Sequence, residues 1–240
     1  MKTLFSLLLG LSVIQAQVKE VKIGKQVWMA KNLNVSTFRN GDPIPQAKTA
    51  EEWKKAFKNN QPACCYYENN AENGKTYGLL YNWYAVNDAR GLAPQGYHIP
   101  TEAEWTILTD YLGYERLAGT KMKSTSGWNS YKGEAECNVC KRWTPEQKAG
   151  QTCTTCNDTR KIKAQISGNG TNSSGFNGLP GGYRYHDGTF DFIGKDGNWW
   201  SSAECHTVLA WTRSLDYDDG DVANDNHYKG NGLSVRCLRD

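Results

Sequence analysis

The 240-residue sequence lacks several features that would assign it to a common functional class. Beyond its first residues it has no apolar run long enough to cross a membrane. It has no GxSxG, no HExxH and no phosphate-binding glycine loop with lysine, which excludes the usual hydrolase, metalloprotease and nucleotide-binding signatures. The formal net charge is only +3, and the short basic run Lys141–Arg142 is not part of a larger platform of aromatic and basic residues. Nucleic acid is therefore a poor candidate partner.

Leucine and isoleucine are also sparse, whereas the chain contains 9 Trp, 13 Tyr and 24 Gly. Such a composition builds a core from aromatic rings and uses many residues in turns and ordered loops. Residues 17–240 are enough for one large domain, or for one domain that carries an insertion.

The first residues, MKTLFSLLLGLSVIQAQ, have the pattern of a secretory signal peptide. Lys2 precedes an apolar run from Leu4 to Ile14, and the small residue Ala16 follows. We expect residues 1–16 to be removed and the mature protein to begin near Gln17. The expected location is therefore secreted, at the cell surface or in the periplasm.

Local patterns predict an α+β fold. Residues 18–35 alternate on either side of a Gly24-Lys25 turn, which favours a β-hairpin. Capping-box patterns at Thr49 and Thr101, each with Glu three residues later, predict two short helices. After Gly168, turn signals separate several short aromatic-rich strands. Helices followed by many short strands indicate helices segregated from antiparallel sheets.

The stretch CNVCKRWTPEQKAGQTCTTC contains two CxxC pairs: Cys137 with Cys140, and Cys153 with Cys156. It lies in a polar segment without evident periodicity, which we interpret as an insertion at about residues 132–167. Because such a segment has no core of its own, it needs a covalent or metal staple. Four thiolates on two tight turns suit a structural zinc ion, while oxidising conditions outside the cell would allow two disulfides instead.

Several motifs along the chain resemble a known family. IGKQVWMAKNLNV, CYYEN, YGLLYNWYAV, GYHIPTEAEW, GFNGLPGGYR, WWSS and NGLSVRCLRD occur in this order over nearly all of residues 17–240. On these motifs the chain resembles the Fibrobacter succinogenes major paralogous domain family of exported bacterial proteins. YHIPTEAEW and GNGLSVRC are also similar to the formylglycine-generating-enzyme/sulfatase-modifying branch of the C-type-lectin-like fold. The resemblance implies that fold, with two short helices, small antiparallel sheets and long ordered loops around the four-cysteine insertion.

The same resemblance raises the question of a copper-dependent thiol oxidase. That reaction uses two thiolates a few residues apart, because Cu(I) needs both sulfurs within bonding reach. The matching segment here, WWSSAECHTVLAWTRS, offers Cys205 followed by His206 and no second thiol. We therefore expect no catalytic residues, with the oxidase kept as an alternative function.

The resemblance also implies a disulfide between Cys65 and Cys237, which would tie the first-helix region to the last strand. In the chain-entropy model, a disulfide that closes so long a loop would stabilise the fold by roughly 4–5 kcal/mol. Cys64 and Cys205 then remain. They are a candidate second bridge, with a Cys64–Cys65 ring or a free Cys205 as alternatives.

The segment SLDYDDGDVANDN gathers five aspartates: Asp216, Asp218, Asp219, Asp221 and Asp225. Calcium needs six to eight converging oxygens, and the EF-hand pattern fails at Gly220. A solvated acidic hairpin is the favoured interpretation, and a calcium site is the weaker one.

Aromatic residues in the expected long-loop region suggest a ligand face. Trp and Tyr rings stack on sugars, and neighbouring polar groups bond to hydroxyls. The alternative is that these residues only build the aromatic core. The candidate ligand-binding residues are Tyr183, Tyr185, His186, Trp199, Trp200, Trp211, Asp216 and Asp218.

Taken together, the sequence predicts an exported, non-enzymatic binding module of residues 17–240. We expect it to recognise carbohydrate, a surface polymer or a protein through its long-loop face. The alternatives are the oxidase and a structural component of the cell surface.

Overall fold

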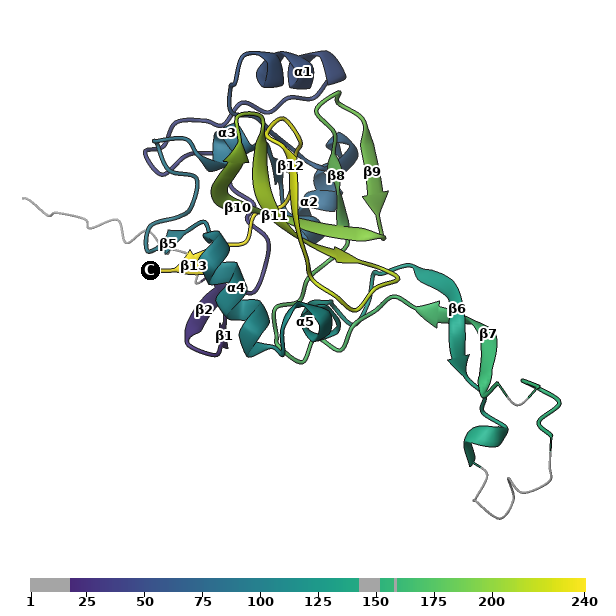
Figure 1. Ribbon diagram of the computed structural model, residues 1–240. Coiled ribbons are helices and arrows are strands. Elements are labelled where there is room, and N and C mark those ends of the chain that lie inside the picture. Colours follow the sequence, from purple (N-terminus) through teal and green to yellow (C-terminus); the bar gives the residue numbers. More distant parts are fainter. Residues whose placement is uncertain (1–17, 143–151, 158) are drawn as a thin grey trace, which may run out of the picture.

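The computed structural model describes residues 18–142, 152–157 and 159–240 (Figure 1). The predicted signal peptide lies outside these described residues. Within them, no helix is both long and apolar enough to cross a membrane. The chain forms a mixed α and β body with small antiparallel sheets, which confirms the predicted fold class.

The predicted N-terminal hairpin is confirmed. Strands β1 (Glu20–Ile23) and β2 (Gln26–Met29) pair antiparallel around Gly24, whose φ of 61° suits the tight turn. Strand β13 (Leu238–Arg239) lies between β2 and β5 (Tyr97–His98), giving the sheet order β1-β2-β13-β5. This sheet therefore pairs the N-terminal hairpin, through β2, with the last strand of the body.

Both predicted helices are present, α1 (Ala50–Lys58) and α4 (Glu102–Tyr111), each with a complete capping box. The expectation of only two helices is wrong, since the described residues also contain α2 (Ala71–Tyr77), α3 (Trp83–Val86) and α5 (Glu115–Met122). Helices α2 and α3 are too short to show helical periodicity, and α5 has no side-chain N-cap. The described part of the chain also contains two 3₁₀ turns: η1 (Tyr67–Asn69) and η2 (Cys140–Arg142).

The second half of the body consists of short strands, as predicted. The largest of these sheets has the order β10-β11-β12. Its strands are β10 (Asp196–His206), β11 (Leu209–Asp216) and β12 (Ala223–Tyr228). Two smaller pairs lie beside it, β3 (Cys64–Cys65) with β4 (Leu80–Tyr81) and β8 (Gly181–Arg184) with β9 (Phe190–Ile193).

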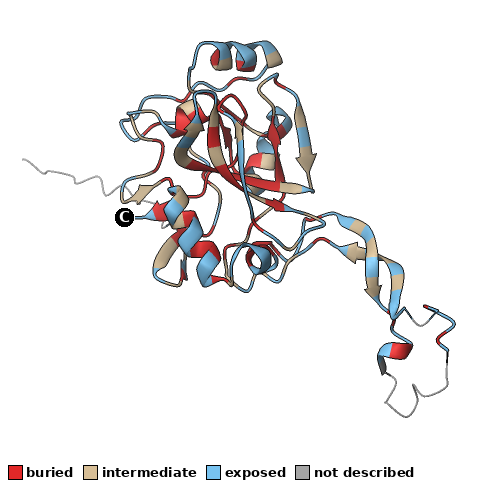
Figure 2. Cartoon of the chain, in the orientation of Figure 1, coloured by how far each residue is buried: buried red, intermediate tan, exposed pale blue. Residues whose placement is uncertain are grey.

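Aromatic rings fill the core of the body, where the buried residues gather (Figure 2). Trp28 and Trp105 lie with ring centroids 4.7 Å apart, and Phe176 meets Trp199 edge-on at 5.5 Å. Edge-on and tilted ring contacts are favourable arrangements of aromatic pairs. The core therefore has the aromatic character that the composition predicts.

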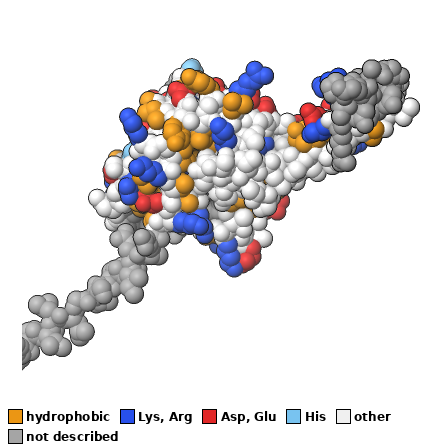
Figure 3. Space-filling view, turned by 90° about the horizontal axis from the view of Figure 1, so that it is seen from below, with side chains coloured by type: hydrophobic (Ala, Val, Ile, Leu, Met, Phe, Trp, Pro, Cys, Tyr) orange, Lys and Arg blue, Asp and Glu red, His pale blue; other side chains and the backbone are white. Residues whose placement is uncertain are grey.

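A two-stranded arm projects from the body (Figures 1 and 3). Strands β6 (Ser130–Glu136) and β7 (Lys161–Ser167) pair antiparallel, and every second residue of each strand is half-buried. The segment predicted to lack periodicity thus has a period of two, which its short, polar strands disguised. On the face shown in Figure 3, basic and acidic side chains are interspersed, as the small net charge suggests.

Arg236 is a fully buried guanidinium that joins three separate segments. It donates hydrogen bonds to the Oδ1 atom of Asn32 and to the backbone oxygens of Met29 and Phe176. Its guanidinium carbon also lies 4.4 Å from the centroid of the Phe176 ring. These acceptors lie at the end of β2, in the segment that follows it and in the loop that contains Phe176.

We predict that Arg236→Met lowers the free energy of unfolding by at least about 3 kcal/mol, because it leaves several buried acceptors without a donor. Arg236→Lys should also destabilise, since one ammonium cannot replace the planar fork. Urea unfolding measures both effects. The control is Arg239→Met, where an exposed ion pair with Glu20 should contribute about 1 kcal/mol or less. Equal stability of Arg236→Met and the wild type would contradict this role.

Candidate functional site

Four cysteines form a compact cluster at the tip of the arm. Cys137 and Cys140 follow β6, while Cys153 and Cys156 precede β7, and all four are buried. Their sulfurs lie within 4.8 Å of one another, with 3.7 Å between Cys137 and Cys153 and 3.6 Å between Cys140 and Cys156. These separations are far longer than the roughly 2.05 Å of a disulfide bond. The cluster is a candidate metal site.

The local backbone favours a thiolate in this cluster. Hydrogen bonds from the backbone at Cys140 and then at Val139 lower the pKa of Cys137 to about 7. The backbone N–H of Cys137 donates to the Arg160 carbonyl across the arm, which fixes the start of the first CxxC turn. Burial raises the pKa of Cys140 to about 12, so a cation in the cluster would be needed to hold its thiolate.

The other four cysteines do not form the predicted disulfides, since all are free thiols in the structure. The reason is the orientation of β3, where neighbouring side chains point to opposite faces. Cys64 shares one core cluster with Cys237, whereas Cys65 packs in another cluster with Trp53 and Tyr67. The Cys65–Cys237 bridge that the resemblance implied is therefore absent from the structure.

Cys205 also lacks the arrangement that a thiol oxidase needs. It lies half-buried on β10, beyond the point where the pairing with β11 becomes irregular. Among the described residues, the thiol pairs recorded within 4 Å are those of the arm tip. The geometry offers no two-thiolate copper site at Cys205.

A separate polar pocket of about 250 Å³ lies on the β10-β11-β12 sheet. Alternate residues of each strand face it: Asp196 and Asn198 from β10, Ser214 and Asp216 from β11, and His227 from β12. Asp196 pairs with Asp216, and Asn198 with Ser214, in the register of the two strands. The period of two thus collects polar side chains from three strands on one face.

Five aspartates line this pocket: Asp196, Asp216, Asp219, Asp221 and Asp225. Burial, and next the neighbouring charge of Asp216, raise the pKa of Asp196 to about 7. Burial also raises the pKa of Asp216. The like charges are therefore crowded, and none of the described residues that line the pocket is Lys or Arg. We call this site the acidic pocket.

The acidic pocket is not a preassembled calcium cage. Among the described residues, the one group of three or more His, Cys, Asp or Glu ligand atoms close enough to share an ion is the cysteine cluster. Asp216 and Asp219 instead accept hydrogen bonds from backbone N–H groups two residues later. These two carboxylates shape the turn between β11 and β12.

Helix α5 and its C-cap residue Lys123 contact the backbone of this turn. The ammonium group of Lys123 donates to the backbone oxygens of Asp216 and Asp219. A Cβ atom on Gly119 would lie only 2.2 Å from the backbone oxygen of Asp221, so the close approach requires glycine. The backbone N–H of Val222 donates to the Glu115 carbonyl at the start of the helix. One wall of the acidic pocket is therefore anchored to α5.

The structure separates the predicted ligand residues. Tyr183 and Asp216 line the acidic pocket, and Tyr185 accepts a hydrogen bond from the Tyr183 hydroxyl. Trp199 and Trp200 are 0% exposed, so they belong to the core and offer no face to a ligand. The others lie elsewhere: His186 against Phe57 and Tyr228, Trp211 half-buried on β11, and Asp218 exposed on the turn outside the pocket lining.

Sequence reasoning missed Asp196, Asn198 and His227. The signal that would find them is the alternation of polar residues along three consecutive strands, once their register is known. Asp196 sits in a hairpin turn signal, KDG, which hid its strand position.

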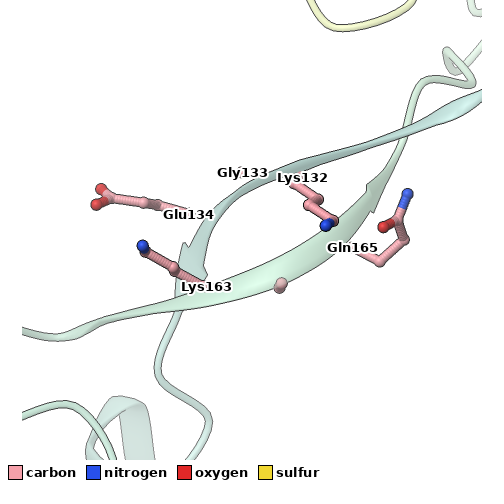
Figure 4. A pocket seen from close by; sticks show the side chains of 6 residues that line it. Lys132, Gly133, Glu134, Lys163 and Gln165 are labelled. Carbon is pink, nitrogen blue, oxygen red and sulfur yellow. The ribbon is translucent and has the colours of Figure 1, made fainter.

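A larger hollow of about 560 Å³ lies on the β6–β7 ribbon (Figure 4). Its side chains are of mixed charge and extend outward from the ribbon, with Lys132, Glu134 and Lys163 among them. No group of polar atoms converges there, so the hollow reflects the open, twisted surface of the arm rather than a binding site.

Comparisons with known proteins identify a family, but no individual relative. The model of the Fibrobacter succinogenes major domain matches residues 21–239, which is nearly all of the described body and the arm. No curated protein and no solved structure matches the chain.

We predict that Gly119→Ala lowers the free energy of unfolding by about 1–3 kcal/mol, because the new Cβ forces the acidic turn away from α5. Urea unfolding measures the loss. Leu117→Ala on the same helix is the control, since Leu117 is 58% exposed and should change stability by about 0.5 kcal/mol or less. If Gly119→Ala proved neutral, the turn would not depend on this contact.

Proposed function

The chain belongs to the Fibrobacter succinogenes major domain family, and from this premise we propose that it is an exported, non-enzymatic binding module with a C-type-lectin-like fold. Its ligand is a carbohydrate, a surface polymer or a protein. The observation that carries the proposal is the acidic pocket, where Tyr183 and Asp216 converge from distant segments. Both belong to the ligand face expected from the sequence.

The pocket is built for recognition rather than for catalysis by a nucleophile. It presents carboxylates, an amide and a hydroxyl on a rigid sheet, with the ring of Tyr183 stacked on Phe192 behind them. Burial lowers the pKa of His227, so this side chain is a neutral hydrogen-bonding group near pH 7. Few precisely placed polar groups on a fixed scaffold are typical of small-ligand sites.

We also propose that the four cysteines at the tip of the arm bind a structural zinc ion, which stabilises the arm. A tetrahedral zinc ion with Zn–S distances of about 2.3 Å places its sulfurs about 3.8 Å apart. The sulfur–sulfur separations of 3.6 and 3.7 Å fit that geometry. Since the arm has only half-buried and exposed strand residues, the ion would supply the stabilisation that an isolated hairpin lacks.

We predict one zinc ion per chain, and that its removal unfolds the arm alone. Native mass spectrometry of the secreted protein counts the ion before and after chelation. Limited proteolysis should then cut between Cys137 and Cys156 in the chelated protein. The melting temperature of the body should stay unchanged, because the cysteine cluster is separate from the body's core clusters.

Variants make this test specific. Cys137→Ser should lose the ion, whereas Cys205→Ser, which alters a thiol outside the cluster, should keep it. Two disulfides in place of the ion, detected as a mass lower by the hydrogens of four thiols, would contradict the zinc site.

We predict that Ala223→Arg weakens ligand binding by about tenfold or more. Ala223 is exposed and lines the acidic pocket, so the new guanidinium would fill it and pair with its carboxylates. A glycan array and pull-downs with polysaccharides and surface proteins measure binding. Asn226→Arg, on the same strand but facing away from the pocket, is the matched control. Failure of the wild type to bind any of these materials would contradict the proposed function.

A further inference from the structure

Asn198 has a polar atom without a partner at the acidic pocket. Its side chain is only 3% exposed, and its Oδ1 accepts a hydrogen bond of 2.7 Å from the Ser214 hydroxyl. Its Nδ2 has no hydrogen-bond partner. Turning the amide over would only exchange the atom that lacks a partner. A buried N–H left unsatisfied costs about 1–3 kcal/mol, so this donor points to an oxygen supplied by a ligand.

The carboxylates beside Asn198 favour a positively charged group in the ligand, in addition to the oxygen that Asn198 requires. Asp196 and Asp216 are direct neighbours across the β10–β11 pair, and the nearby Lys123 ammonium is engaged with backbone oxygens beneath the turn. The raised pKa values of both carboxyls express their burial and crowding. A bound cation would relieve this repulsion.

We infer that the acidic pocket binds a sugar residue that carries a free amino group, an inference that rests on the proposed binding function. The ammonium group pairs with Asp196 and Asp216. A ring hydroxyl accepts the hydrogen bond of Asn198 Nδ2, and other hydroxyls donate to the outer carboxylates of Asp219 and Asp225. A volume of about 250 Å³ is smaller than the usual pocket for a drug-sized ligand and suits a single sugar ring.

Other ligands satisfy only part of this site. A neutral sugar would match Asn198 but leave the crowded carboxylates without a counter-charge. An acidic sugar would add to the repulsion. A lysine side chain from a protein would supply the cation, but it has no oxygen to accept the hydrogen bond of Asn198.

The test compares matched ligands by isothermal titration calorimetry on the full mature protein near pH 7. The probes are a glucosamine tetramer, the same tetramer with every amine N-acetylated, a tetramer of galacturonate, and Nα-acetyl-lysine amide. Acetylation removes the charge and keeps the rings and linkages. We expect the free-amine tetramer to bind at least about tenfold more tightly than each of the others, as charge-assisted hydrogen bonds imply.

Two substitutions of Asp by Asn locate the effect. Asp196→Asn removes one pocket charge with little change in volume and should abolish the preference for the free amine. Asp110→Asn makes the same change of net charge on the exposed face of α4, outside the pocket lining, and should preserve the preference. Thermal unfolding of each variant verifies that it is folded.

Each outcome decides the inference. An amine preference lost in Asp196→Asn and kept in Asp110→Asn supports it. Equal binding of the amine and N-acetyl tetramers overturns it but leaves the proposed binding function standing. Binding of the lysine amide as tightly as of the amine tetramer overturns it in favour of a protein ligand. If no tetramer binds, it is overturned, and the array and pull-downs decide the proposed function separately.

Discussion

The body depends on buried polar side chains that satisfy the backbone of its long loops. Its sheets are small, so many backbone oxygens have no strand partner. Arg184 illustrates the solution, since it is 1% exposed and donates to the backbone oxygens of Ala47, Thr49 and Gly188. Its guanidinium also lies over the rings of Trp53 and Phe190. Arg236 does the same for the segments around the N-terminal hairpin. These hydrogen bonds fix the loops to the aromatic core and satisfy backbone oxygens that would otherwise be buried without a donor.

The arm follows a different physical rule. Its strands bury too little apolar surface to be stable alone, and its tip gathers four thiols instead. Packing therefore orders the body, while ligand bonds to a metal ion would order the arm. The two parts can differ in stability and in their response to chelators and oxidants, although one chain carries both. The acidic pocket lies on the body, so the ligand binding proposed for it would not depend on the thiols.

Much of the fold could be predicted from local patterns. The capping boxes at Thr49 and Thr101 and the hairpin around Gly24 are confirmed, because each depends on residues only a few positions apart. The spacing of the CxxC pairs likewise predicted a cluster of four cysteines. The strands of the arm and three short helices escaped prediction. The arm strands are polar, α2 and α3 are too short to show helical periodicity, and α5 has no side-chain N-cap. The C-type-lectin-like resemblance implied a Cys65–Cys237 bridge, and the direction in which β3 turns its side chains prevents it.

The sequence by itself determined the aromatic core, the α+β class, the family and the thiol cluster, all of which arise from composition, motifs or close spacing. Only the tertiary structure decided which polar residues meet. Asp196 and Asp216 are twenty positions apart, and they become neighbours because the register of β10 and β11 places them opposite each other. Trp199 and Trp200, by contrast, resemble ligand residues in the sequence but are removed from solvent by packing. Burial and register depend on the whole chain at once, so a pocket built from them cannot be seen in any one segment.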